Sequence, residues 1–217
     1  MDVFGNFINI IMHIDKYLNL IVQQYGILTY VILFAIIFFE TGLVVTPFLP
    51  GDSVLFAAGA IAAISSLNIF TLLIIIYLAA VLGDTVNYHI GKKIGAKILE
   101  KEDIRFINKE YLKKAQDFYE KHGSMTIVIA RFIPIIRTFA PFVAGIGEMK
   151  YKKFIPYNMI GGALWVSLFL CGGYFFGNLS FIRNNFSYVL IAIIIISLLP
   201  GIVVFIKEKK KVESSAF

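Results

Sequence analysis

Four charged residues interrupt stretches of the chain that are otherwise apolar: Glu40, Asp52, Arg131 and Arg137. Each is close to residues of the kinds that break or bend helices: Pro47, Pro50, Gly51, Pro134 and Pro141. One charge at the centre of a bilayer costs roughly 2.5–3.5 kcal/mol, so acids and arginines in such segments must pair or line a hydrated cavity. We therefore take these four residues as the candidate functional site, and the breaks as the tips of helical hairpins.

The two arginines indicate phosphate binding. Together they offer more N–H donors than two carboxylates can accept, and a guanidinium group suits bidentate contact with phosphate. We predict that Arg131 and Arg137 hold the phosphate of a lipid headgroup. Glu40 and Asp52 would balance the charge, and burial favours the protonated acid once its cationic partner leaves, which makes both candidate proton carriers. The alternative is that the four charges are buried structural ion pairs.

Four more residues are secondary candidates for substrate contact: Asp84, Tyr88, Asn158 and Trp165. We expect Asp84 mainly to cap the end of a membrane span near the interface, and Trp165 to pack against helices or face lipid. Metal binding is not expected, because the three histidines lack ligand spacing and a single cysteine cannot build a Cys-based zinc site. No cofactor is expected either.

The composition indicates lipid as the solvent. Of the 217 residues, 59% are hydrophobic and 16% are charged, against about 45–50% and about 25% in soluble domains. The net charge of +6 does not predict a nucleic-acid partner, because the basic residues gather over 92–121 and 207–211, beside apolar segments. The positive-inside rule places both stretches in the cytoplasm. We expect an all-α polytopic membrane protein with a cytoplasmic C-terminus.

The apolar runs divide into half-length and full-length segments. Two runs are broken in the middle, and each arm is too short to cross the hydrocarbon, so we predict re-entrant hairpins over 27–65 and 125–147. Three full spans are predicted, over 69–91, 154–177 and 188–206. The other segments are predicted to be an interfacial amphipathic helix over 1–25, cytoplasmic amphipathic helices over 92–123 and a cytoplasmic tail over 207–217.

The order of a hairpin followed by a span occurs twice. Gly91 and Gly95 recur 82 positions later as Gly173 and Gly177, and Ala58-Gly59 recurs 86 positions later as Ala144-Gly145. One span separates the two hairpins, so the second unit would be inverted relative to the first, as in transporters whose broken helices meet at the midplane. We expect the glycine pairs to allow close helix approach.

These motifs resemble the two signatures of the DedA family, the bacterial members of the VTT-domain (SNARE-associated Golgi protein-like) membrane proteins. The first resemblance runs from Glu40 through Pro47 and Pro50-Gly51-Asp52 to Ala58-Gly59, and the second from Arg131 through Pro134, Arg137 and Pro141 to Met149. The resemblance implies inner-membrane proteins with two opposed re-entrant hairpins that act as lipid translocases. It also implies that Glu40, Asp52, Arg131 and Arg137 are the functional residues.

We therefore predict a flippase, not an enzyme, that returns undecaprenyl phosphate across the bacterial cytoplasmic membrane for cell-wall synthesis and is coupled to protons. Its expected partners are a polyprenyl phosphate or a phospholipid, membrane lipids and protons. One alternative is a non-selective phospholipid scramblase, the activity of the family's eukaryotic relatives. Another is a proton-coupled ion or drug antiporter, in which the acids would matter more than the arginines. A purely structural assembly factor is the third.

Overall fold

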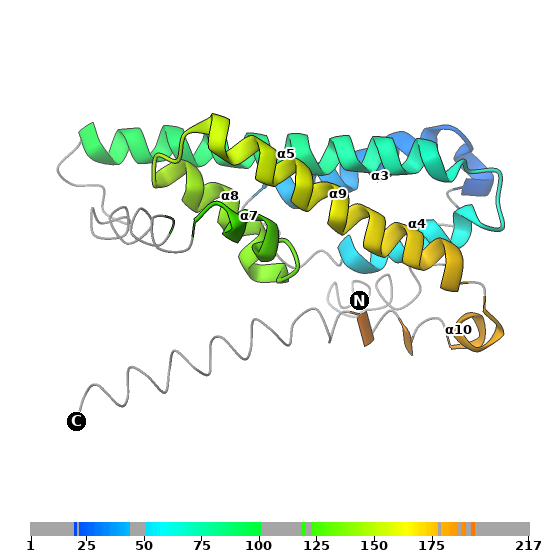
Figure 1. The fold of residues 1–217 in the computed structure, drawn as a ribbon. Coiled ribbons are helices and arrows are strands. Elements are labelled where there is room, and N and C mark those ends of the chain that lie inside the picture. Colours follow the sequence, from blue (N-terminus) through cyan, green and yellow to red (C-terminus); the bar gives the residue numbers. More distant parts are fainter. Residues whose placement is uncertain are drawn as a thin grey trace, which may run out of the picture.

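All regular structure in the described part of the protein is helical. The computed structural model describes residue 20 and residues 22–43, 51–100, 119, 123–177, 179–185, 188–189 and 192–193, with the backbone alone at 95–100, 134–135 and 183–184. The helices (Figure 1) are α3 (Leu28–Gly42), α4 (Gly51–Ala62), α5 (Ile69–Glu100), α7 (Met125–Ala130), α8 (Pro134–Ile146), α9 (Tyr151–Phe176) and α10 (Ser180–Asn184). The predicted all-α class is confirmed for these residues.

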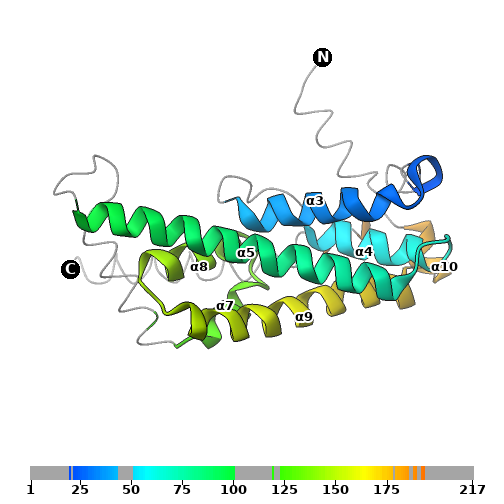
Figure 2. The same cartoon turned by 90° about the horizontal axis from the view of Figure 1, so that it is seen from above.

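Two long helices, α5 and α9, pack against each other and run in opposite directions along the molecule (Figures 1 and 2). Each contains a stretch of 26 residues that is long and apolar enough to cross a membrane: Ile69–Ile94 in α5 and Tyr151–Phe176 in α9. The side chain of Asn68 caps α5, because its Oδ1 accepts the N–H groups of Phe70 and Thr71 at 2.9 and 3.1 Å. The third predicted span, 188–206, lies largely outside the described residues.

The helix of the first predicted span is longer than that span. The span is predicted over 69–91 and further helices over 92–123, whereas α5 continues without a break from Ile69 to Glu100. The pair Lys92-Lys93 changes the polarity of the surface, but lysine is a good helix former and no proline follows to end the helix. The second span, predicted over 154–177, occupies Tyr151–Phe176.

Several predicted surface segments fall on residues that the structure does not describe. These are most of the amphipathic helix over 1–25, residues 101–118 of the cytoplasmic helices and the tail over 207–217. Their predicted structures, and the predicted cytoplasmic side of the C-terminus, stay predictions.

Each predicted hairpin contains two helical arms, α3 with α4 and α7 with α8. At about 1.5 Å per residue, the 12 residues of α4 extend roughly 18 Å, well short of the roughly 30 Å of hydrocarbon in a bilayer. The end of α3 and the starts of α4 and α8 meet near the middle of the molecule (Figure 2), where the side chain of Glu40 contacts both Gly51 and Arg137. The two hairpins therefore approach this point from opposite ends of α5.

Proline has a different effect at each predicted break. The chain is extended at Ile133, with φ −120° and ψ 105°, as the following Pro134 favours, and Pro134 then begins α8. The prediction that Pro141 is a break is wrong, because α8 runs through it. Contacts with α5 on both sides of Pro141 hold the helix together, at Thr138 and at Phe142. Pro47 and Pro50 lie outside the described residues.

Glycine allows α4 to pack directly on the backbone of α9. A Cβ atom at Gly173 of α9 would overlap the carbonyl oxygen of Phe56 in α4. A Cβ atom at Gly59 of α4 would in turn overlap the carbonyl oxygen of Leu170 in α9. The predicted close approach of helices at glycine is confirmed here.

The second return arm, α8, packs on α5 in the same manner. A Cβ atom at Gly91 of α5 would overlap the carbonyl oxygen of Phe142, and one at Gly145 of α8 would overlap that of Tyr88. The return arm of each hairpin therefore packs on the long helix that follows the other hairpin in the predicted repeat.

Two apolar clusters fill the interior of the described residues. The first lies among α3, α4, α5 and α9 and reaches Ala80 on α5. The second is smaller, includes Ile127 and Phe154, and begins on α5 at Tyr88. Asp84 lies between the two clusters along α5, so the buried polar groups occupy the middle of the molecule.

Gly173→Ala is expected to lower stability by about 1–3 kcal/mol, because the added methyl group would overlap backbone atoms of Phe56 that cannot rotate away. Gly172→Ala is the matched control: the change is the same, but the nearest atom to its Cβ, Cε2 of Phe56, is 4.0 Å away. Thermal unfolding of the purified proteins in detergent measures both. Equal melting temperatures would contradict the direct contact between α4 and α9.

Candidate functional site

Arg137 joins the two hairpins through ion pairs with both predicted acids. Its Nη1 donates to Oδ1 of Asp52 at 2.7 Å, and its Nη2 donates to Oε1 of Glu40 at 2.5 Å. All three side chains are buried. Of the two possibilities that the sequence leaves open, direct pairing or a hydrated cavity, these three side chains show direct pairing.

The local sequence places each acid at a helix end. Glu40 lies in the last turn of α3 and accepts the backbone N–H of Gly51 at 3.0 Å, so it also caps the first turn of α4. Asp52 lies in that first turn, where the positive end of the helix dipole favours a carboxylate. A side chain at Gly51 would overlap the Glu40 carboxylate, which explains glycine at this position.

Trp165 completes this group, which we call the Arg137 cluster: Arg137, Glu40, Asp52 and Trp165. Its indole Nε1 donates to Oδ1 of Asp52 at 2.8 Å, and the guanidinium carbon of Arg137 lies 4.8 Å from the centre of its ring. The guanidinium carbon of Arg131 lies 6.0 Å from the same ring. Trp165 is fully buried between the two arginines, so it does not face lipid; it packs in the helix interior, as one of the two expectations has it, and in addition binds the charged groups.

Arg131 pairs with a different acid. Its Nη2 donates to Oδ2 of Asp84 and to Oδ1 of Asn158, whose own side-chain amide donates to the carbonyl oxygen of Val81 at 3.1 Å. These residues form what we call the Arg131 cluster: Arg131, Asp84 and Asn158. The expectation that Asp84 caps a span end near the interface is wrong, because Asp84 is buried inside α5 with 16 helical residues after it.

Two polar residues near the clusters donate hydrogen bonds to backbone carbonyl oxygens of other segments, so their role is structural. Asn87 donates from its amide nitrogen to the carbonyl oxygens of Thr41 at 3.1 Å and Thr138 at 2.8 Å, which links α5 to both hairpins. Tyr88 donates from its hydroxyl to the carbonyl oxygen of Met149 and belongs to neither cluster. The sequence analysis does not single out Asn87. Asn87 follows Asp84 by three positions and therefore lies on the same face of the helix, which is the signal that could have predicted its burial.

The two clusters hold three carboxyl groups and two guanidinium groups. Five of their buried polar atoms have no hydrogen-bond partner in the described structure: Nε and Nη1 of Arg131, Nε of Arg137, Oε2 of Glu40 and Oδ1 of Asp84. Buried polar groups are normally paired, so these five atoms are the unusual feature of the two clusters. Arg131 offers two of the three free donors and Arg137 one.

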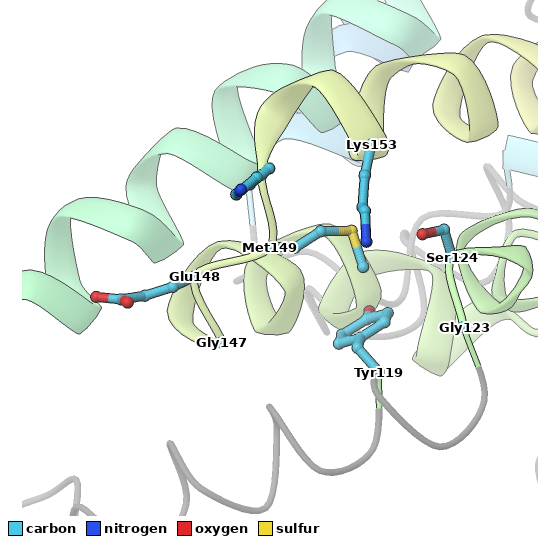
Figure 3. Close-up of a pocket in the computed structure, with 8 residues that line it drawn as sticks. Tyr119, Gly123, Ser124, Gly147, Glu148, Met149 and Lys153 are labelled. Carbon is cyan, nitrogen blue, oxygen red and sulfur yellow. The ribbon is translucent and has the colours of Figure 1, made fainter.

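A separate cavity of about 590 Å³ lies at the other end of α8, beside the start of α9 (Figure 3). Its lining includes Tyr119, Ser124, Lys150 and Lys153, and none of the residues of the two clusters. Burial raises the pKa of the Tyr119 hydroxyl, which donates to the carbonyl oxygen of Ala140 at 2.6 Å. We assign the candidate site to the clusters, because both lysines are exposed whereas both arginines are buried.

The described residues contain no group of three or more His, Cys, Asp or Glu side chains placed to hold a metal ion. The buried acids are instead matched by guanidinium groups. The arrangement thus provides charge and hydrogen-bond donors inside a set of apolar helices.

Arg137→Met is expected to lower stability by about 3–5 kcal/mol, because it leaves two buried acids without their cation. Adding Glu40→Gln and Asp52→Asn removes the uncompensated charges and is expected to restore most of the loss. Thermal unfolding in detergent measures both proteins. A single variant as stable as the wild type, or a triple variant no better than the single one, would contradict the pairing.

Comparison with known proteins finds a matching domain and several relatives. The VTT domain matches residues 49–175. The chain is 47% identical to Protein DedA of Escherichia coli K12 over 218 residues, covering 100% of both chains. It is 42% identical to a membrane protein of Mycobacterium tuberculosis over 170 residues (77% of this chain, 74% of the relative), and 31% identical to the inner membrane protein YghB of E. coli K12 over 187 residues (83% and 85%).

No solved structure matches the chain. The domain match covers more than half of the residues, and the match to Protein DedA extends from end to end. The relatives are named as membrane proteins, in keeping with the two long apolar helices. The chain therefore belongs to the DedA family of VTT-domain membrane proteins.

Proposed function

We propose that the protein is a flippase for a lipid that carries a phosphate, namely undecaprenyl phosphate in the bacterial cytoplasmic membrane. The observation that carries the proposal is a pair of buried arginines with free N–H donors, on segments that pack against the two helices long enough to cross a membrane. Buried guanidinium groups suit the phosphate of a headgroup, and the isoprenoid chain would stay in the bilayer.

The proposed architecture is an inverted repeat of two re-entrant hairpins that open to opposite sides of the membrane. Equivalent contacts support it: Phe56 meets Gly173, and Phe142, 86 positions after Phe56, meets Gly91, 82 positions before Gly173. A site between two opposed, broken helices is where transporters of this kind expose a substrate alternately to each side.

The contacts suggest different tasks for the two arginines. Both outer nitrogens of Arg137 are occupied by acids of the opposite hairpin. Arg131 uses a single nitrogen for Asp84 and Asn158 and keeps two others free. Arg131 is therefore the group that first takes the phosphate, and Arg137 follows when an acid releases it.

The charge balance supports coupling to protons. With all groups ionised, three carboxylates and two guanidinium ions give the paired clusters a net negative charge, and a phosphate anion adds to it. Protonation of Glu40 or Asp52 weakens its hold on Arg137 and offsets one of these negative charges. One proton taken up with each phosphate therefore lowers the electrostatic cost of binding it.

Arg131→Lys is expected to reduce flux of undecaprenyl phosphate in reconstituted vesicles by roughly tenfold or more. Lysine keeps the charge but loses the planar fork, and a hydrogen bond to a charged group contributes about 1.5–3 kcal/mol. Lys92→Arg, at an exposed position on α5, is the control and should transport normally. Full flux in Arg131→Lys would remove Arg131 from the proposed phosphate site.

Glu40→Gln is expected to make the flux insensitive to a proton gradient. The amide oxygen still accepts from Gly51 and Arg137, but the group no longer binds and releases a proton. Glu148→Gln alters an exposed acid and should leave the response intact. Flux of undecaprenyl phosphate measured with and without an imposed pH gradient tests this. An unchanged gradient response in Glu40→Gln would sink the assignment.

The same vesicles distinguish the competing functions. Equal movement of phosphatidylglycerol and undecaprenyl phosphate without a gradient would identify a scramblase. Proton-linked movement of an ion or drug, with the arginine variants active, would identify an antiporter. Preference for undecaprenyl phosphate together with a gradient response supports the flippase.

A further inference from the structure

A surface groove of about 230 Å³ lies between α5 and α9. Three residues of each helix line it: Leu73, Ile74 and Tyr77 of α5, and Ala163, Val166 and Ser167 of α9. Ile74 is 60% exposed, and Ala163 and Ser167 are exposed as well, so the groove opens to the outside of the two long helices. Its volume is below the roughly 300–1,000 Å³ of pockets that enclose a whole ligand, which suits a segment of a hydrocarbon chain.

The surface around the groove is apolar. Leu78 on α5 and Leu164 and Leu168 on α9 are 46%, 52% and 59% exposed. Both helices are apolar enough to cross the membrane, so these side chains face lipid tails. A hydrocarbon chain therefore has direct access to the groove from the bilayer.

Gly162 of α9 lies between the groove wall and the Arg131 cluster, and the side chain of Val81 is closest to it, 3.2 Å from its Cβ position. A Cβ atom at this position would lie 3.5 Å from Cε2 of Tyr77, in the groove wall, and 3.6 Å from the guanidinium carbon of Arg131. The preceding residue, Gly161, faces Nε of Arg131 at 3.4 Å from its own Cβ position. Between Asn158 and Trp165, which both contact Arg131 from α9, two successive glycines thus place no side chain against the guanidinium group.

The unpaired nitrogen atoms of Arg131 are a second observation, independent of the groove, that points to a ligand. Its side chain is among the largest that are fully buried, yet Nε and Nη1 have no hydrogen-bond partner in the described structure. An apolar groove that leads to free cationic donors complements a molecule with a long hydrocarbon tail and an anionic head.

We propose that the groove between α5 and α9 holds the first part of the hydrocarbon tail of a phosphate-bearing lipid while its phosphate reaches Arg131 beside Gly162. This inference rests on the proposed lipid transport and adds the lateral site through which the lipid enters. The occupant is a lipid and not free phosphate, because six apolar or weakly polar side chains line the groove and none carries a charge.

The groove also has a definite depth in the membrane. Leu73 and Tyr77 lie near the start of α5, at the end opposite Lys92-Lys93, while Asp84 lies farther along toward the lysines. The positive-inside rule puts the lysine end in the cytoplasm, so the groove lies in the outer half. A lipid phosphate that starts in the outer leaflet thus meets the groove first and Arg131 next.

Photo-crosslinking tests the site directly. The photoreactive residue p-benzoylphenylalanine is placed at Ser167, in the groove, or at Leu168, the next residue, which is exposed but outside it. The protein is reconstituted in phosphatidylglycerol vesicles with a trace of labelled undecaprenyl phosphate. Random contact with membrane lipid labels both positions equally, whereas a bound lipid labels position 167 severalfold more than 168.

Competition with unlabelled molecules distinguishes the contribution of the lipid phosphate from that of the hydrocarbon tail. Unlabelled undecaprenyl phosphate is expected to abolish the excess at position 167, whereas inorganic phosphate leaves it unchanged. Undecaprenol, which lacks the phosphate, should compete weakly, and Arg131→Gln should remove the excess. Equal labelling at 167 and 168, or an excess that Arg131→Gln does not change, would overturn the proposal.

A blocked groove gives the functional test. Ser167→Trp fills the groove from an exposed position and is expected to cut undecaprenyl phosphate flux at least severalfold, while Leu168→Trp adds the same side chain outside it and keeps normal flux. Equal flux in the two variants with an active wild type would reject the groove and leave the flippase standing. An inactive wild type would reject the flippase itself.

Discussion

The bond between Arg137 and its two acids is the interaction on which the arrangement of the hairpins depends. Glu40 ends one arm of the first hairpin and Asp52 begins the other, so a single guanidinium group from the second hairpin fixes the spacing of both. Removing three charges from water is costly, and these groups are stable only together. Gly51 and Trp165 each donate a further hydrogen bond to the two acids.

Such short bonds are possible because the helices approach to backbone contact. Glycines at Gly173 and Gly91 remove the side chains that would hold α4 and α8 away from the long helices. The indole of Trp165 then lies within 6.0 Å of both guanidinium carbons, so one aromatic face serves both clusters. Close packing and the buried charges therefore support each other.

The sequence shows which residues are unusual but not how they pair. Glu40, Asp52, Arg131 and Arg137 stand out because their neighbours are apolar, and the half-length arms follow from the breaks beside them. The partner of each arginine is a tertiary contact across 27 to 97 positions, which no local pattern specifies. The expected place of Asp84 differs from the observed one for a local reason: a span that ends before Lys92 has Asp84 near its end, whereas α5 continues to Glu100 and has Asp84 in its middle. Pro141 shows that packing can override a strong local signal.

The exchange of return arms between the two halves has a consequence for how the chain is made. Synthesis proceeds from the N-terminus, so α4 enters the membrane long before α9, the helix it packs on, exists. Arg137 is synthesised 85 residues after Asp52, and Trp165 is synthesised 113 residues after it. The nascent first half therefore carries three acids, Glu40, Asp52 and Asp84, without their arginine partners, and the second half gives them a stable place in the bilayer when it is added.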